Sequence, residues 1–296
     1  MVQESLTPLP EGLAFLSGAY LPLAEARVPA LDRGFLFGDG AYEVIPVYSR
    51  QPFRLAQHLE RLSRTLAALR IDDPHTPEVW ADIVRQVIAG NPWEDQGVYL
   101  QVTRGVDRRR SQAFPPSSVR PTVFLFAEPL PTPGAEQVRD GVAAVGAGDF
   151  RWLRCDLKTT SLLANCLLRQ HAVDQGAVET ILFRDGFLTE GAASSIFVVR
   201  QGRVAVPAKS HLMLPGVTYD VVLELAATHG MPVEVRDVPE AEVRAADEIW
   251  MTSSPVEVLP IVRLDGRPVG EGRPGPLVRQ MIGWYQEFKR TVMRGA

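Results

Sequence analysis

Three prolines and a glycine fall within the seven residues from Glu128 to Gly134 of this 296-residue chain. Proline lacks an amide hydrogen and fixes its φ angle, so this segment is unsuited to a helix interior or a central strand. A chain of this length is also long for one hydrophobic core. We therefore expect a smaller N-terminal domain (residues 1–127) and a larger C-terminal domain (residues 136–296), joined by a linker at residues 128–135.

Both halves mix helix and strand patterns, which favours the α+β class. A helix is predicted from Leu55 because leucines recur at spacings of three and four through Leu69. Its other face carries His58, Arg61, Arg64 and Arg70. For each of the three arginines a solvent-facing position is the ordinary expectation. The glycine-punctuated segment Asp32–Gly40 is expected to be a loop.

Further elements follow from periodicity and from turn residues. In the first half we expect a strand pair turning at Ser17-Gly18, a helix at residues 77–89, and strands at 41–48, 97–103 and 122–127. In the second half we expect helices at 161–175, 217–229, 240–246 and 276–293, and strands at 141–146, 232–236 and 248–254. Three more strands with turns at 185–186 and 201–202, and a hairpin at 265–266, complete the prediction.

The composition excludes several classes of protein. A net charge of −4 argues against a nucleic acid or an anionic membrane as the main partner. No apolar run approaches the roughly 20 residues of a membrane span, and we see no signal peptide at the N-terminus. Cys155 and Cys166 show no metal-ligand spacing with histidine, so we expect no metal site. Free thiols suit a reducing compartment, and the expected location is cytoplasmic.

Lysine is scarce in this chain. Of the 31 lysines and arginines, only Lys158, Lys209 and Lys289 are lysines. A lysine amine can lose its proton and attack a carbonyl, whereas a guanidinium stays protonated. Lys158, within the segment Arg151–Thr160, is therefore a candidate for imine formation with pyridoxal phosphate or with a substrate carbonyl.

Other residues could complete a pyridoxal phosphate site. Such a site needs an anionic partner for the ring nitrogen and donors for the phosphate. Glu190 is expected at a strand end, and Val217-Thr218 opens a helix whose first N–H groups suit a phosphate. Ser253-Ser254 adds hydroxyls at another strand end. Each feature alone is more often structural, and only the set favours this cofactor.

The chain resembles the fold-type-IV pyridoxal-phosphate aminotransferases, and most closely their D-amino-acid transaminases. The resemblance covers nearly the whole chain. It is carried by seven segments in one order: residues 32–44, 58–62, 99–105, 151–158, 188–191, 214–218 and 247–254. It implies a two-domain fold, a homodimer, and small-molecule amino donors and 2-oxo acids as partners. It also implies that the Arg108–Gln112 loop closes the pocket of the neighbouring subunit.

The resemblance implies a role for each matching residue. Lys158 would hold pyridoxal 5'-phosphate as the internal aldimine and shuttle the proton, and Glu190 would pair with the ring nitrogen. Leu214 would pack on the ring. The phosphate would be bound by Arg61, Val217, Thr218 and Ser254. With this role, Arg61 is no longer expected to face solvent. The substrate would contact Tyr42, Val44, Arg109 and Gln112.

Two departures from the family pattern affect the substrate and cofactor sites. In the D-amino-acid enzymes an arginine and a nearby histidine bind the substrate carboxylate, but Ser111 or Gln112 occupies the histidine position here. Arg109 alone can still bind a carboxylate with two hydrogen bonds. In relatives the segment that corresponds to Glu190–Ser195 is usually serine-rich and ends in asparagine. This chain lacks that asparagine.

The leading hypothesis is a D-amino-acid transaminase that moves the amino group of D-alanine to 2-oxoglutarate by a ping-pong route. The missing histidine makes an (R)-selective amine transaminase the first alternative. A branched-chain aminotransferase is disfavoured because Tyr99-Leu100-Gln101 stands where those relatives have Tyr-x-Arg. An aminodeoxychorismate lyase and a catalytically silent protein of the same fold are further alternatives.

Overall fold

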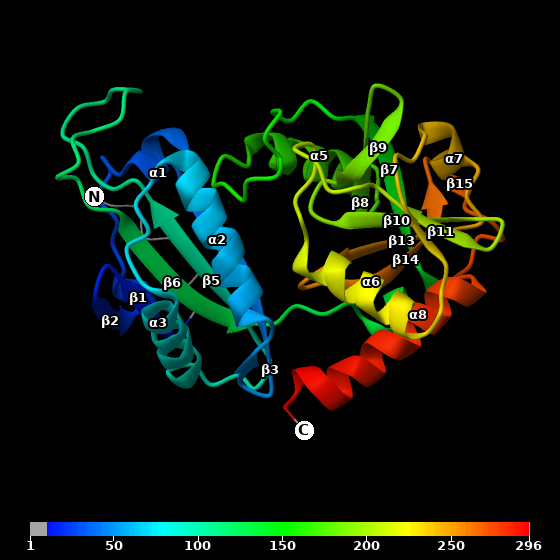
Figure 1. The fold of residues 1–296 in the computed structure, drawn as a ribbon, viewed down its shortest axis with the longest axis horizontal. Coiled ribbons are helices and arrows are strands. Elements are labelled where there is room, and N and C mark those ends of the chain that lie inside the picture. Colours follow the sequence, from blue (N-terminus) through cyan, green and yellow to red (C-terminus); the bar gives the residue numbers. More distant parts are fainter. Residues whose placement is uncertain (1–10, 296) are drawn as a thin grey trace. The chain divides into compact units, whose positions relative to one another are not determined.

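The computed structural model describes residues 11–295, and the chain divides into two compact units (Figure 1). Unit 1 contains the chain through Leu130 together with the short segment Lys158–Ser161. Unit 2 contains Pro131–Leu157 and the chain from Leu162 onward. No helix among the described residues is long and apolar enough to cross a membrane.

Unit 1 is built on a six-stranded antiparallel sheet in the order β2-β1-β6-β5-β3-β4. Helix α2 (Leu55–Leu69) packs on β3, and helix α3 (Pro77–Ala89) packs on β1, β5 and β6. Leu59, Leu62 and Leu66 of α2 are buried with strand residues in one apolar core, and Leu55 and Leu69 pack against it. The strands are β1 (Leu13–Leu16), β2 (Ala19–Pro22), β3 (Gly40–Tyr48), β4 (Gln51–Pro52), β5 (Gln96–Thr103) and β6 (Thr122–Pro129).

One local expectation for unit 1 is wrong. The segment Asp32–Gly40 is not a plain loop, because it contains the short helix α1 (Arg33–Phe37). The Asp32 carboxylate accepts a hydrogen bond from the Gly34 N–H at 2.8 Å, and Gly38 ends the helix with φ at 65°. Strand β6 is present where a strand was predicted and continues through Pro129. Leu23–Glu25 forms a short 3-10 helix.

The segment Lys158–Ser161 joins the sheet of unit 1 although it comes late in the sequence. The Tyr42 N–H donates to the Lys158 carbonyl at 3.0 Å, and the Thr160 N–H donates to the Gly40 carbonyl at 3.0 Å. Ala41 and Thr159 form an antiparallel bridge between these two hydrogen bonds. The backbone of Lys158 is therefore fixed next to the start of β3.

Unit 2 is built on a nine-stranded mixed sheet in the order β12-β11-β10-β13-β14-β7-β8-β9, with β15 paired to β14. Strand β7 runs parallel to β8 and β14, and β11 runs parallel to β12, while the other pairs are antiparallel. The strands are β7 (Val142–Gly148), β8 (Glu179–Arg184), β9 (Phe187–Gly191), β10 (Ser195–Arg200), β11 (Arg203–Val206), β12 (Val233–Val235), β13 (Glu248–Ser253), β14 (Glu257–Leu264) and β15 (Arg267–Pro268).

The helices of unit 2 agree with most of the predicted ranges. They are α4 (Ala135–Asp140), α5 (Leu163–Asp174), α6 (Val217–Thr228), α7 (Glu240–Arg244) and α8 (Pro276–Phe288), which continues as a π-helical turn at Lys289–Met293. Helix α4 was not expected, and four strands (β8–β11) stand where three were predicted. The mixture of helices and largely antiparallel sheet confirms the α+β class.

Candidate active site

Lys158 lies against an aromatic wall in unit 1. Its Nζ is 4.1 Å from the centroid of the Tyr42 ring, which stacks on Tyr99 at 5.6 Å. An amine over a ring face is attracted by the π electrons. Burial raises the pKa of Tyr99 to about 12, and the nearby Tyr42 phenol adds to the rise. The Tyr99 phenol therefore remains neutral at ordinary pH and adds no charge to the wall beside the lysine.

Strand β3 presents opposite faces at consecutive residues. Tyr42 and Val44, both proposed to contact substrate, are half-buried, whereas Glu43 between them is completely buried. Glu43 lies instead in a charged cluster with two residues of α2. Arg61 donates from Nε to Oε1 at 2.8 Å and from Nη2 to Oε2 at 2.7 Å, and His58 Nδ1 lies 2.8 Å from Oε2.

Burial alone would raise the pKa of Glu43. The charge and hydrogen bonds of Arg61, with a contribution from His58, override burial and lower the pKa of Glu43 to about 2. Burial lowers the pKa of His58, so the imidazole is neutral and donates its Nδ1 hydrogen to the carboxylate. His58 Nε2 has no hydrogen-bond partner among the described residues and is buried, which leaves a buried acceptor beside the ion pair.

This cluster also corrects the expectation for the polar face of α2. His58 and Arg61 are buried, whereas Arg64 and Arg70 are exposed as expected. For Arg61 the resemblance already indicated a functional position.

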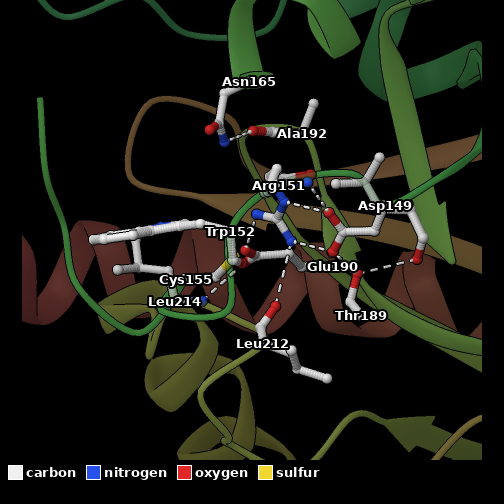
Figure 2. A network of polar contacts seen from close by, with 12 residues as sticks. Asp149, Arg151, Trp152, Cys155, Asn165, Thr189, Glu190, Ala192, Leu212 and Leu214 are labelled. Atoms are coloured by element: carbon white, nitrogen blue, oxygen red, sulfur yellow. Dashed lines mark hydrogen bonds and ion pairs between the residues drawn. The ribbon is translucent and has the colours of Figure 1, made fainter. Parts of the chain in front are cut away.

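Glu190 lies at the end of β9 in unit 2 and is held by two donors (Figure 2). The Arg151 Nη1 donates to Oε1, and the Leu214 N–H donates to Oε2 at 3.1 Å. Burial raises the pKa of Glu190 to about 7, against the charge of Arg151 and the Leu214 hydrogen bond, which both lower it. A carboxyl group poised near neutrality and aimed by fixed donors is suited to share a proton with a ring nitrogen.

Arg151 bridges two carboxylates. Besides Glu190 it binds Asp149, through Nε at 3.0 Å and Nη2 at 2.9 Å. Asp149 is in turn held by the Thr189 hydroxyl at 3.0 Å and by Arg184 at 3.1 Å. Figure 2 shows Arg151 between the two acids. This network holds the Glu190 carboxylate in addition to the Leu214 N–H, so its orientation does not depend on one contact.

The start of α6 fits an anion. Val217 and Thr218 are its first residues, and no side chain caps the helix at Gly216, so the first N–H groups remain available to a ligand. A β-carbon at Gly216 would lie 3.3 Å from Ser195 Oγ, so glycine preserves a close approach there. Ser195 pairs with Thr252 across β10 and β13, and Thr252 Oγ1 is buried without a hydrogen-bond partner among the described residues. Ser254 follows β13 and is half-buried.

Each unit, taken by itself, carries chemical groups of the kind that pyridoxal 5'-phosphate requires. Unit 2 offers a buried carboxyl group, an uncapped helix start and an unpaired hydroxyl, and unit 1 offers an amine on an aromatic wall. These are the chemical groups that the ring nitrogen, phosphate and aldehyde of this cofactor require. Within residues 11–295 no cluster of histidine, cysteine and acidic side chains could hold a metal ion.

The remaining two predicted site residues lie in the loop between β5 and β6. Arg109 and Gln112 are both exposed there. Within unit 1 the structure brings Lys158 and Tyr42 together, and within unit 2 it brings Glu190 and Leu214 together. The main-chain groups of Arg109 and Gln112 are near Asp107 and Arg33, respectively.

Sequence reasoning missed the residues that hold the expected ones. Arg151 is inside the segment that carries the resemblance, but its partner Glu190 is 39 residues away, and no local pattern connects them. For Glu43 the sequence did contain a signal. It is an acid within an apolar strand, next to a helix whose predicted solvent-facing side carries His58 and Arg61, and such an acid is expected to be paired.

Residues 40–264 match the family described as Amino-transferase class IV. The chain belongs to this family and is an aminotransferase.

Relatives of known activity match over almost the entire chain. The D-alanine aminotransferase of Staphylococcus haemolyticus is 34% identical over 274 residues, covering 93% of this chain and 96% of that protein. The D-alanine aminotransferase of Bacillus licheniformis is 37% identical over 265 residues, covering 90% and 93%. These identities confirm the resemblance to D-amino-acid transaminases.

Solved structures agree on the fold. The branched-chain aminotransferase of the archaeon Thermoproteus uzoniensis with norvaline superposes with a TM-score of 0.84 at 25% identity, covering 97% of this chain and 96% of that one. The Escherichia coli branched-chain enzyme gives 0.85 at 24% identity, covering 92% and 93%. This likeness confirms the fold-type-IV architecture predicted from the sequence.

Proposed function

We propose that this aminotransferase acts on D-amino acids and moves the amino group of D-alanine, or of a similar donor, to 2-oxoglutarate by a ping-pong route. The products would be pyruvate and D-glutamate. The observation that carries the proposal is the 37% identity to a D-alanine aminotransferase over 90% of this chain. The branched-chain enzymes among the solved structures have lower identities and support the fold.

We propose pyridoxal 5'-phosphate as the cofactor. A branched-chain enzyme of the same fold was solved with the amine form, pyridoxamine 5'-phosphate, which supports this assignment. When bound, the cofactor supplies an electron sink for the bond that is broken at the donor's α-carbon. Lys158 would bind it covalently and afterwards accept and return the α-proton at Nζ. That nitrogen lies 4.1 Å from the centroid of the Tyr42 ring and forms no ion pair with an acid among the described residues, so no carboxylate competes for it.

Glu190 would hold a proton between its carboxylate and the ring nitrogen. Arg151 and Leu214 keep the carboxylate oriented, and its pKa of about 7 matches the proton affinity of a pyridine-type nitrogen better than an ordinary glutamate does. Leu214 would pack on the ring. For the phosphate we assign Arg61, Val217, Thr218 and Ser254, because these positions offer a guanidinium, helix N–H groups and hydroxyls.

Half-reaction spectroscopy tests this proposal. The purified enzyme, loaded with pyridoxal 5'-phosphate, is mixed with D-alanine or L-alanine without an oxo acid. We expect D-alanine to convert the absorbance of the bound aldehyde form to that of the amine form, with stoichiometric pyruvate, and L-alanine to be at least about 100-fold slower, a difference of roughly 3 kcal/mol in transition-state binding. Failure of D-alanine to convert the cofactor rejects the proposal.

A second candidate is an (R)-selective amine transaminase. The loop between β5 and β6 lacks a histidine, and the side chain of Arg109 is exposed. A donor panel of D- and L-amino acids with (R)- and (S)-arylalkyl amines separates the two candidates. If (R)-amines without a carboxylate react as fast as D-alanine, this candidate replaces the first.

The assembly and location belong to the same proposal. We propose a homodimer, following the family resemblance, which light scattering of the purified protein tests directly. We propose a cytoplasmic location because Cys155 and Cys166 are both free thiols.

A further inference from the structure

The loop that carries Arg109 depends on contacts outside itself to hold one conformation. Residues 104–121, between β5 and β6, contain no helix and no strand, and Arg108, Arg109 and Arg110 are consecutive and exposed there. Three like charges repel one another, and a loop of this length loses substantial conformational entropy when it holds one conformation. Something outside the loop has to supply the stabilisation.

Arg33, in α1, supplies it through main-chain carbonyls. Its Nη1 donates to the Ser111 carbonyl at 2.6 Å and to the Ala113 carbonyl at 3.3 Å, and its Nη2 donates to the Gln112 carbonyl at 3.4 Å. Its Nε donates to Asp39 Oδ2 at 2.8 Å. Arg33 is only 2% exposed, so these bonds form away from water, where each is stronger.

Two aromatic rings anchor the loop on either side of these carbonyls. The Arg110 guanidinium lies 5.4 Å from the Phe37 ring centroid, and Arg33 lies 4.8 Å from the same ring. The Phe114 ring centroid lies 3.7 Å from the Arg104 guanidinium. Both arginines that hold the loop, Arg33 and Arg104, bind Asp39, so one carboxylate fixes both anchors.

Some groups of the loop contact the body of unit 1, whereas others have no such contact. Arg110 and Phe114 point back to the body of unit 1 through their ring contacts, and the carbonyls of residues 111–113 point to Arg33. The side chain of Arg109 makes no ion pair among the described residues and is exposed. Because Arg33 binds main-chain oxygens, it holds the loop whatever side chains stand at positions 111 and 112.

We propose that Arg33 is a positioning residue that orders this loop and thereby presents Arg109 to the carboxylate of the donor. This proposal rests on the proposed D-amino-acid specificity. It explains how the chain dispenses with a histidine, since a single guanidinium discriminates for carboxylates only if its backbone is held in place. Arginine is needed at position 33 because lysine has no planar fork to span several acceptors.

Limited proteolysis tests the ordering without any use of activity. Trypsin cleaves after arginine, and the run Arg108–Arg110 is its natural target once the loop opens. We compare wild type, Arg33→Gln and Arg33→Lys, and use Arg85→Gln on the exposed face of α3 as a control. Fragments are assigned by mass spectrometry, and folding is checked by circular dichroism.

We expect cleavage at residues 108–110 to be about tenfold faster in both Arg33 variants, which corresponds to a loss of about 1.4 kcal/mol in loop closing, and unchanged in Arg85→Gln. If Arg33→Gln does not fold, Arg33→Lys decides, because it keeps the positive charge beside Asp39. Equal cleavage rates in wild type and in folded Arg33→Lys overturn the proposal.

Steady-state kinetics test the link to Arg109. We expect Arg33→Lys to raise KM for D-alanine by about tenfold with kcat little changed, and to leave an (R)-amine without a carboxylate unaffected. The double variant Arg33→Lys/Arg109→Ala should show no larger KM than Arg109→Ala alone. Additive effects mean that Arg33 does not act through Arg109. If wild type does not turn over D-alanine, the proposed function fails, and the trypsin result still decides whether Arg33 orders the loop.

Discussion

The carboxylate of Glu43 lies edge to edge with the guanidinium of Arg61, with Oε1 2.8 Å from Nε and Oε2 2.7 Å from Nη2. Both residues are buried, at 0% and 5% exposure. A two-point contact fixes the plane of the guanidinium. Glu43 therefore sets the orientation of the Arg61 side chain within unit 1.

Replacing Glu43 with glutamine should destabilise unit 1. The variant Glu43→Gln removes the carboxylate that pairs with the buried Arg61 guanidinium, and loss of one partner of a buried ion pair costs about 3–5 kcal/mol. The free energy of unfolding in urea at pH 7 measures this loss. Asp82→Asn, which removes an exposed partner of Arg85, is the control and should change stability by less than about 1 kcal/mol.

The acid stability of the same pair follows from the low pKa of Glu43. This group has a pKa of about 2 in the folded chain against an ordinary value of 4.5. Its stabilisation is thus complete above pH 4.5 and is lost as the pH falls toward 2. Between pH 5 and pH 3 wild type should lose about 2 kcal/mol more than Glu43→Gln. Parallel pH profiles of the two proteins contradict this account.

Lys158→Arg should abolish transamination while keeping a long basic side chain beside the Tyr42 ring. Arginine forms no imine at accessible pH, and loss of a covalent nucleophile costs on the order of 10³-fold or more in kcat. Borohydride treatment of wild type loaded with pyridoxal phosphate should mark the peptide that contains Lys158, as mass spectrometry reports. Lys209→Arg, at an exposed ion pair with Asp220, should retain both activity and labelling; labelling at another lysine instead argues against the assignment.

Arg151→Met should destabilise unit 2 in a pH-dependent manner. It leaves Glu190 without its guanidinium partner, at a cost of about 3–5 kcal/mol when the acid is ionised. The folded pKa of Glu190 is already raised to about 7 from 4.5, so the native state binds the proton more tightly than the unfolded state. Stability then falls as the pH rises from 4.5 to about 7. Without Arg151 the pKa of Glu190 should rise further.

Urea unfolding at pH 6 and pH 9 checks this prediction. The difference in stability between wild type and Arg151→Met should be larger at pH 9, where the unpaired acid is forced to ionise. Arg154→Met removes an arginine from a more exposed pair with Asp156 and should show a small difference that does not vary with pH. A deficit for Arg151→Met that is equal at both pH values is the opposing result.

Arg109→Ala should weaken recognition of the donor carboxylate. A two-point guanidinium–carboxylate contact is a strong hydrogen-bonded pair, and its loss should raise KM for D-alanine by about 10–100-fold. The rate with an (R)-amine should be little affected. Arg108→Ala, the neighbouring exposed arginine, is the matched control, and equal effects of the two substitutions would mean that the loop acts only through its overall charge.

Elements with a strong local pattern were predictable from the sequence, whereas contacts between distant segments were not. The leucine spacing predicts α2 because burial of one helix face requires apolar residues at spacings of three and four. The turn residues Ser17-Gly18 predict the β1–β2 hairpin. Helix α1 was missed because it is held by the Asp32 cap and by Gly38 rather than by an apolar face. Arg151 and Glu190 are 39 residues apart in the sequence and come into contact only when the sheet of unit 2 is assembled.

The placement of residues 158–161 limits how this protein can be cut and recombined. Their main-chain hydrogen bonds to Gly40 and Tyr42 complete unit 1, yet the chain on both sides of them belongs to unit 2. A gene fragment that ends at Leu130 would encode a sheet whose β3 edge has lost these partners. Chimaeras between relatives that exchange only the N-terminal block would set Lys158 on a foreign strand. The two segments therefore have to be inherited, and engineered, as one piece.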